Sequence, residues 1–330
     1  MKKKWTAVLL LLALTASLLA GCKQEENDQE KLPTSEGFTS DVVMRIGGKD
    51  VSYAEANIYL MSMREEVETL YGTDIWDFVF TSEGETYSTL MKKELLQKII
   101  YIKLVCFMAD EFNVALDADD ILNVNDYTQE YMSGVTEEAV KQYGITEELI
   151  RSIYMDNVLA EKIYETITLN AEKNYDDDDV LRANFQYIRL SKYYEDLEGN
   201  QVAITGDELT AVREKADRLL AEAQTAEDFY GFAKENTDDS TVEMTVGKSD
   251  LPVNSSAAAF ALKDGELSGV VEEEDGFYIF YCKSARDELA TQVAEEALIA
   301  ELSQEYFDSL YQKWIENVTI EINQALWDAM

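Results

Sequence analysis

The stretch from Asn184 to Lys283 constrains the fold of this 330-residue chain most, because its hydrophobic pattern differs from the patterns on either side. It opens with a strand pattern at 184–190 and closes with strand patterns that lead up to Lys283. Between them the pattern reads helix, helix, short strand or loop, and small helix. Four short signals lie within this stretch, in this order: Thr225–Phe229, Asn236–Ser240, Gly265–Val271 and Gly276–Phe280. We therefore expect an α/β unit here.

Helical periodicity dominates the chain before this stretch. Val42–Ile46 and Val51, joined by a turn at 47–48, predict a small hairpin. Ser52 and Glu55 then predict a capping box at the start of a helix. That helix is expected to carry its apolar face on Ala56, Leu60, Met63, Val67 and Leu70. Further helices are expected at 87–112, 117–131, 136–143 and 146–170.

The C-terminal segment returns to helical spacing. We predict one long helix at 289–315, with an apolar stripe on Ile299, Leu302, Tyr306, Leu310 and Trp314. After it, apolar and polar residues alternate over 318–322, as in a half-buried strand. We expect this strand to pair with Val42–Ile46.

Composition excludes several classes of function. The chain has 66 acidic and 28 basic residues and a net charge of −38, which argues against nucleic acid as a partner. It contains no histidine, so histidine-based triads and histidine metal sites are excluded. Cys106 and Cys282 fall in different predicted units, and we expect both to be buried free thiols.

The N-terminus has the pattern of an export signal. Lys2–Lys4 precede an apolar run from Trp5 to about Ala20, and Leu19-Ala20-Gly21-Cys22 resembles a bacterial lipobox. We expect a signal peptide at 1–21, a lipid on Cys22 and a flexible tether at 22–40. The protein would then be held on the extracytoplasmic face of the cell membrane. An ordinary membrane anchor is the alternative.

Four consecutive aspartates, Asp176–Asp179, mark the junction between the predicted units. Calcium binding is one interpretation, since Ca²⁺ prefers oxygen ligands. Four adjacent carboxylates cannot all face one ion, however, so a solvated hinge that repels itself open is favoured. We expect no metal and no cofactor.

The order and spacing of the signals between 184 and 283 resemble a parvulin domain, a prolyl cis/trans isomerase module. The hairpin, the Ser-Tyr-x-Glu helix start and the following amphipathic helices resemble the chaperone domain of PrsA and SurA foldases. The resemblance implies an α+β chain with a SurA/PrsA-type helical domain formed by both chain ends and an inserted parvulin-like domain. The expected divisions are 41–175 for the N-terminal helical part, 182–284 for the parvulin-like domain and 285–330 for the returning segment.

Carried over residue by residue, the resemblance assigns a catalytic group and a proline pocket. The two histidine positions fall on Tyr187 and Tyr278, and the Cys or Asp position falls on Asp239. The pocket positions fall on Leu251, Ser255 and Phe260. In one interpretation both tyrosines approach Asp239 and keep weak isomerase activity. In the other they only pack, and the domain is a peptide-binding or spacer module.

The resemblance makes a membrane-anchored foldase or chaperone for unfolded exported polypeptides the first hypothesis. An inactive scaffold comes second, and a solute-binding lipoprotein is a distant third because its two α/β lobes are absent. Five aromatic residues lie around the first long connection: Tyr71, Trp76, Phe78, Phe80 and Tyr87. We expect their rings either to line an apolar cleft that binds clients or to form the core of the domain. The acidic body would favour basic or weakly charged clients, or serve only solubility.

Overall fold

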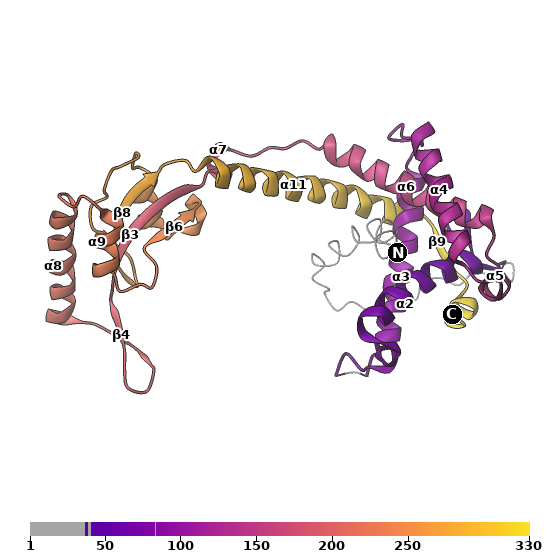
Figure 1. Cartoon of the computed structure of the whole chain (residues 1–330), viewed down its shortest axis with the longest axis horizontal. Helices are drawn as coiled ribbons and strands as arrows, with labels where there is room; N and C mark the ends of the chain where they lie inside the picture. Colours follow the sequence, from indigo (N-terminus) through magenta and orange to yellow (C-terminus); the bar gives the residue numbers. More distant parts are fainter. Residues whose placement is uncertain (1–36, 39–40, 83) are drawn as a thin grey trace. The chain divides into compact units, whose positions relative to one another are not determined.

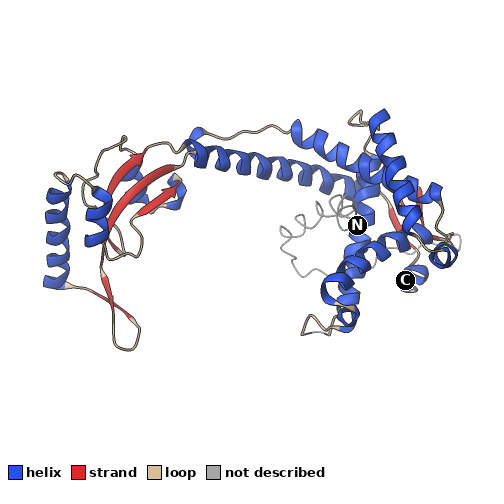
Figure 2. Cartoon of the chain, in the orientation of Figure 1, coloured by secondary structure: helices blue, strands red, loops and turns tan. Residues whose placement is uncertain are grey.

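The computed structural model describes residues 37–38, 41–82 and 84–330, which form two compact units (Figure 1). The helical unit combines the residues up to Ala171 with Ser303–Met330, and the α/β unit is Glu172–Leu302. Both contain helices and strands (Figure 2), so the expected α+β class is confirmed. The predicted signal peptide, Cys22 and nearly all of the predicted tether lie outside the described residues.

A three-stranded antiparallel sheet joins the two chain ends in the helical unit. Its strands are β1 (Val42–Ile46), β2 (Lys49–Ser52) and β9 (Ile320–Ile322), in the order β2-β1-β9. Met44 pairs with Ile322 and Ile46 pairs with Ile320. The predicted hairpin and the predicted pairing of the C-terminal strand with Val42–Ile46 are both confirmed.

The helices of this unit begin at side-chain caps that the sequence supplies locally. Thr86, Asp117, Thr136 and Thr146 each accept a backbone N–H from the residue three positions on. The predicted helix at 87–112 ends earlier, at Phe107, because the chain turns there and Asn113 adopts a positive φ of 52°. The elements are α2 (Tyr53–Tyr71), η2 (Thr73–Asp77), α3 (Tyr87–Phe107), α4 (Ala118–Gly134), α5 (Glu137–Tyr143), α6 (Glu147–Leu169), the C-terminal part of α11 (Glu288–Asn317) and α12 (Gln324–Asp328).

The core of the helical unit is formed chiefly by α3, α6 and α11. Phe307 of α11 is fully buried, and its ring centroid lies 4.8 Å from that of Tyr164. Trp314 is buried as predicted, but Tyr306 is exposed, so the predicted stripe is wrong at that position. Leu70 at the end of α2 is exposed as well. The error at Tyr306 arises because the neighbouring side chain, Phe307, covers the core instead.

An ion triad around the buried Glu55 takes the place of the second hydrogen bond of the predicted capping box. The Ser52 hydroxyl accepts the Glu55 N–H at 3.1 Å, as expected. The Glu55 carboxylate instead lies 2.5 Å from the Lys103 ammonium, which also lies 2.5 Å from Asp156. These three residues tie α2, α3 and α6 together.

The α/β unit is built on a four-stranded antiparallel sheet in the order β6-β3-β8-β7. Residues of α8 and α9 pack with Ile188 and Ile279 on one face, whereas α10 packs with Phe185 and Phe280 on the other. The elements are β3 (Ala183–Ser191), α8 (Gly206–Ala223), α9 (Phe229–Asn236), β6 (Glu243–Val246), η3 (Lys248–Asp250), α10 (Val253–Ala259), β7 (Val271–Glu272) and β8 (Gly276–Ser284). Cys106 and Cys282 are free and buried, as predicted.

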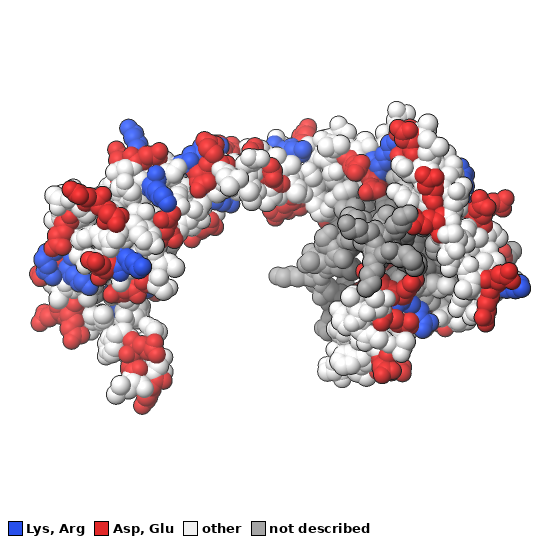
Figure 3. All heavy atoms as spheres, viewed as in Figure 1, with Lys and Arg blue, Asp and Glu red and all other residues white. Residues whose placement is uncertain are grey.

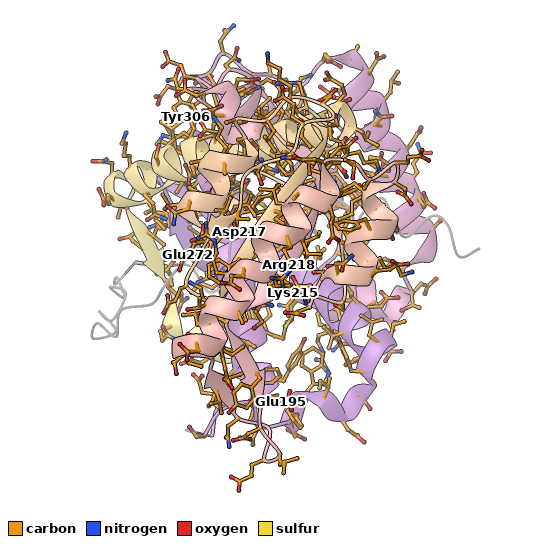
Figure 4. All side chains as sticks on the ribbon, turned by 90° about the vertical axis from the view of Figure 1, so that its left-hand side faces the viewer. Glu195, Lys215, Asp217, Arg218, Glu272 and Tyr306 are labelled. Atoms are coloured by element: carbon orange, nitrogen blue, oxygen red, sulfur yellow. The ribbon has the colours of Figure 1, made fainter. Side chains whose placement is uncertain are left out.

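The outer surface of the α/β unit is charged. Lys215, Asp217 and Arg218 project from the exposed side of α8 (Figure 4). A separate two-stranded ribbon, β4 (Tyr193–Glu195) with β5 (Gln201–Ala203), precedes this helix. Leu197 at its tip is fully exposed.

The four aspartates form a capped helical turn, α7 (Asp177–Val180), rather than a turn that repels itself open. The N–H of Asp176 donates to Asp179 Oδ2 at 2.8 Å, and the N–H of Asp179 donates to the Asp176 carbonyl at 3.0 Å. Asp177 pairs with Arg286 at 3.0 Å, and Asp178 pairs with Lys248. Local cations therefore offset the repulsion on which the predicted hinge depended.

Candidate functional site

The predicted catalytic residues lie on the sheet face that α10 covers. Tyr187 of β3 pairs with Phe280 of β8, and Arg189 pairs with Tyr278. Because side chains at alternate positions share a face and paired residues lie on the same side of a sheet, these four side chains form one group. The Tyr278 ring stacks on Phe280, with centroids 5.7 Å apart.

Arg189 is the centre of this group, although the sequence reasoning did not identify it. Its Nη1 donates to Asp239 Oδ1 at 2.8 Å, and its Nε donates to Asp275 Oδ2 at 3.0 Å. Asp239 follows α9, and its N–H donates to the Thr237 hydroxyl at 3.2 Å. The guanidinium is therefore paired with two carboxylates, one from each side of the sheet face.

Both tyrosine hydroxyls are engaged next to this ion group. Tyr278 donates to Asp275 Oδ2 at 2.7 Å, and Tyr187 lies 3.1 Å from the Thr241 hydroxyl. Burial raises the pKa of both phenols, and the adjacent carboxylates, Asp275 for Tyr278 and Asp239 for Tyr187, raise it further. Both hydroxyls are therefore held in the neutral form at ordinary pH.

We call Tyr187, Arg189, Asp239, Asp275 and Tyr278 the charge cluster. The structure places the three predicted residues within it, but the hydroxyl of Tyr278 bonds to Asp275 rather than to Asp239. Arg189 could have been found from the sequence, because it lies two positions after Tyr187 and so shares its face. Asp275 lies in the turn before β8 and gives no comparable signal.

The predicted pocket residues pack beneath the same face. Phe260 meets Phe185 edge-on at 5.3 Å, and Leu251 packs against the same core. Ser255 is only 1% exposed, and its N–H donates to Glu273 Oε1 at 2.6 Å. Its side chain therefore lies in the interior and does not offer an open wall to a ligand.

A second candidate site lies in the helical unit, around η2 and the loop between α2 and α3. Tyr71, Phe78 and Phe80 are 56–67% exposed, whereas Trp76 and Tyr87 are half-buried. Tyr87 lies 5.6 Å from Trp76 and 5.8 Å from Phe80 between ring centroids. The interpretation of these rings as domain core is therefore wrong for the three exposed ones. With exposed Leu70, the six residues form what we call the aromatic patch.

Backbone hydrogen bonds hold the loop that carries the aromatic patch. The N–H of Phe80 donates to the Glu85 carbonyl at 2.8 Å, and the N–H of Tyr87 donates to the Phe78 carbonyl at 2.9 Å. The Trp76 indole N–H donates to Glu68 at 2.7 Å. In Figure 3 this end of the unit is largely white, with red side chains beside it. The rings are thus presented to solvent by an ordered scaffold.

None of the helices that the structure describes is both long and apolar enough to span a bilayer. Within the same residues, no group of three or more Cys, Asp or Glu side chains has the arrangement of a metal site.

Comparison with known proteins relates both units to one family. Residues 189–297 match the PPIC-type PPIASE domain. The chain is 23% identical to the foldase protein PrsA of Caldanaerobacter subterraneus subsp. tengcongensis, over 84% of this chain and 82% of that protein. It is 21% identical to the foldase protein PrsA of Clostridium kluyveri, over 95% and 96% of the two chains. The crystal structure of PrsA from Lactococcus lactis aligns with 87% of this chain and 96% of its own, at 15% identity and a TM-score of 0.34.

Proposed function

The chain is a PrsA-type foldase with a PPIC-type domain, and we propose that it binds unfolded polypeptides outside the cytoplasm and keeps them competent to fold. The observation that carries this proposal is the aromatic patch, whose Phe78 and Phe80 are more than half exposed. Large apolar side chains grouped at the surface mark a site for apolar partners. Unfolded chains display such side chains, and folded ones bury them.

The size of the patch fits reversible binding. Burial of one Phe or Leu side chain contributes roughly 1.5–3 kcal/mol. A few rings together therefore give weak contacts, because ordering a flexible client opposes them. Weak contacts let a client leave once it has buried its own apolar side chains.

The protein is anchored, in this proposal, by a lipid on Cys22. The support is the sequence Leu19-Ala20-Gly21-Cys22 after a short apolar run. A lipid joined to the Cys22 sulfur by a thioether would hold the protein at the membrane. The acidic folded part could not do so by itself, because anionic lipids repel it. Replacing Cys22 with alanine is expected to abolish incorporation of labelled fatty acid. Retained label would contradict the anchor and leave the chaperone proposal intact.

The α/β unit serves in this proposal as a peptide-binding or spacing module with little isomerase activity. Catalysis of X–Pro rotation requires groups that bind the twisted amide better than the planar one. In the charge cluster, both phenols and both carboxylates already have partners. An inactive scaffold is therefore a second candidate for this unit, and the helical unit carries the binding.

Aggregation of a reduced, unfolded client tests the main proposal. The variant Phe78→Ser/Phe80→Ser is expected to lose most of the suppression seen with the unchanged protein. The control Leu122→Ser/Leu169→Ser removes two apolar side chains that are 61% and 75% exposed elsewhere in the same unit. It is expected to keep full suppression. If the unchanged protein failed to suppress aggregation at any stoichiometry, the proposal would be wrong.

A further inference from the structure

The aromatic patch is bordered by two carboxylates, Glu66 and Glu94, that form no ion pair among the described residues. Tyr87 and Glu94 lie seven residues apart on α3, so both face the same side of that helix. Tyr87 also lies within electrostatic range of Glu66 and Tyr71 on α2. Within the part of the chain that the structure describes, neither Glu66 nor Glu94 has an ion pair or a side-chain hydrogen bond.

The cations near the patch are already engaged. Arg64 pairs with Glu68 at 3.3 Å and lies 5.4 Å from the centre of the Trp76 ring. Lys93 pairs with Glu85 at 2.6 Å. Lys98 attracts Glu66 but is buried and forms no ion pair among the described residues. The aromatic surface therefore has an excess of negative charge at its edge.

Glu94 in particular lies in surroundings that favour a bound cation. It is half-buried, and this burial raises the pKa of its carboxyl group. An ammonium or guanidinium group placed beside it would stabilise the charged carboxylate, because the attraction between opposite charges is stronger where water is partly excluded. The face of the Tyr87 ring attracts the same cation through its ring electrons.

We propose that the aromatic patch binds unfolded segments in which a lysine or arginine lies beside an aromatic or aliphatic residue, with Glu66 and Glu94 receiving the cation. This inference rests on the proposed chaperone function and names its substrate class. Apolar side chains of the segment cover Phe78 and Phe80. The net charge of −38 adds long-range attraction for such segments.

Charge also distinguishes this occupant from a second copy of the chain. Two copies that met at this patch would bring Glu66 and Glu94 of each against the same carboxylates of the other. Like charges facing each other across an interface oppose association. A client segment with a cation has the opposite effect.

Three short peptides and two pairs of substitutions test the inference. The first peptide carries two Phe and two Lys, the second has Gln in place of Lys, and the third has Ser in place of Phe. The unchanged protein is expected to bind the first about tenfold more tightly than the second at low salt, given one cation–π contact and two charge contacts. A change in tryptophan emission that is lost in Trp76→Phe reports binding at the patch, because Trp76 lies there and Trp314 and Trp327 are buried.

The variant Glu66→Gln/Glu94→Gln is expected to bind the first peptide no better than the second, with affinity for the second unchanged. Gln keeps the side-chain shape and removes one exposed charge, at Glu66, and one half-buried charge, at Glu94. The variant is therefore expected to fold, and a thermal melt checks this. Glu305→Gln/Glu316→Gln is the matched control. It removes the same charge from exposed helical positions of the same unit and is expected to keep the tenfold preference.

The outcomes separate this inference from the proposed function. Equal binding of the first and second peptides by the unchanged protein would overturn the role of the cation, while suppression of aggregation would still stand. A preference that both double variants lower equally would also overturn it, because net charge alone would then be responsible. Failure of all three peptides together with no suppression of aggregation would remove the proposed function itself. Self-association abolished by Phe78→Ser/Phe80→Ser would instead assign the patch to a second copy.

Discussion

The charge cluster of the α/β unit and the aromatic patch of the helical unit differ in how far their groups are engaged. In the charge cluster, Arg189 holds two carboxylates and each phenol has a hydrogen-bond partner. In the patch, Phe78 and Phe80 face solvent and Glu94 lacks a cation among the described residues. A site with satisfied groups stabilises the fold, whereas unsatisfied groups favour a ligand. The family's name for the domain therefore does not identify where this chain binds its clients.

Lys98 is a buried cation of the helical unit that, unlike Arg189, forms no ion pair among the described residues. Its replacement is expected to have the largest effect on the free energy of unfolding. Burial lowers the pKa of Lys98 from 10.5 to about 8, with Glu66 opposing the shift. Because each pKa unit corresponds to about 1.4 kcal/mol, the charged form destabilises the fold by roughly 3 kcal/mol at pH 7. Lys98→Met is therefore expected to raise the free energy of unfolding by roughly 2–3 kcal/mol in urea titrations.

The pH dependence of that gain has a definite sign. Between about pH 8 and 10.5 the unfolded chain holds a proton on Lys98 that the folded chain has lost. Stability of the unchanged protein therefore rises with pH through this window, and the advantage of Lys98→Met shrinks. A gain that stayed constant from pH 7 to 10 would show that methionine acts by packing alone.

Removal of the central cation tests whether the charge cluster is structural. Arg189→Leu leaves Asp239 and Asp275 without their shared partner, and we expect the free energy of unfolding to fall by about 1–2 kcal/mol. The side chains of Arg189 and Asp239 are 20% and 26% exposed, so water weakens the effect. Arg286→Leu is the matched control, because its partner Asp177 is 70% exposed. It is expected to change stability by less than about 1 kcal/mol.

The same two variants can also be compared in the client-aggregation assay. If the charge cluster only stabilises the fold, Arg189→Leu suppresses client aggregation as well as the unchanged protein does, at temperatures where both are folded. Loss of suppression without unfolding would make the charge cluster a binding site and weaken the case for the patch.

Local signals in the sequence were sufficient for most of the fold. Caps such as Thr86 and Thr146 set helix starts through hydrogen bonds three residues away, which a linear pattern contains. Alternation at 318–322 likewise predicted a strand that the structure pairs with β1. Helix phase was less certain, because Tyr306 and Phe307 are neighbours and only tertiary contacts decide which one is buried.

The candidate sites depended more on contacts between distant residues. Asp275 joins the charge cluster only because the register of β3 and β8 places Arg189 opposite Tyr278. Likewise, the sequence could not decide whether Phe78 and Phe80 were core or surface, since aromatic residues suit both. The predicted approach of Tyr278 to Asp239 failed because Asp275 lies closer in the turn and accepts its hydroxyl.

The smallest expected effect concerns catalysis. We expect isomerisation of an X–Pro peptide to proceed close to its uncatalysed rate, and Tyr187→Phe/Tyr278→Phe to change that rate less than about twofold. The reason is that the neutral phenols donate to, or share hydrogen bonds with, protein oxygens rather than facing a twisted amide. Each tenfold acceleration requires about 1.4 kcal/mol of preferential transition-state binding, and engaged groups have little to supply.

An NMR exchange assay or a protease-coupled assay checks this, with Tyr281→Phe on the opposite sheet face as the control. Asp239→Ala frees one side of Arg189 and is also expected to leave the rate near background. Strong catalysis by the unchanged protein, lost in Asp239→Ala and in the double tyrosine variant but kept in Tyr281→Phe, would contradict this expectation. The charge cluster would then be an active site in which phenols and a guanidinium replace imidazoles, and the α/β unit would act on the clients that the patch binds.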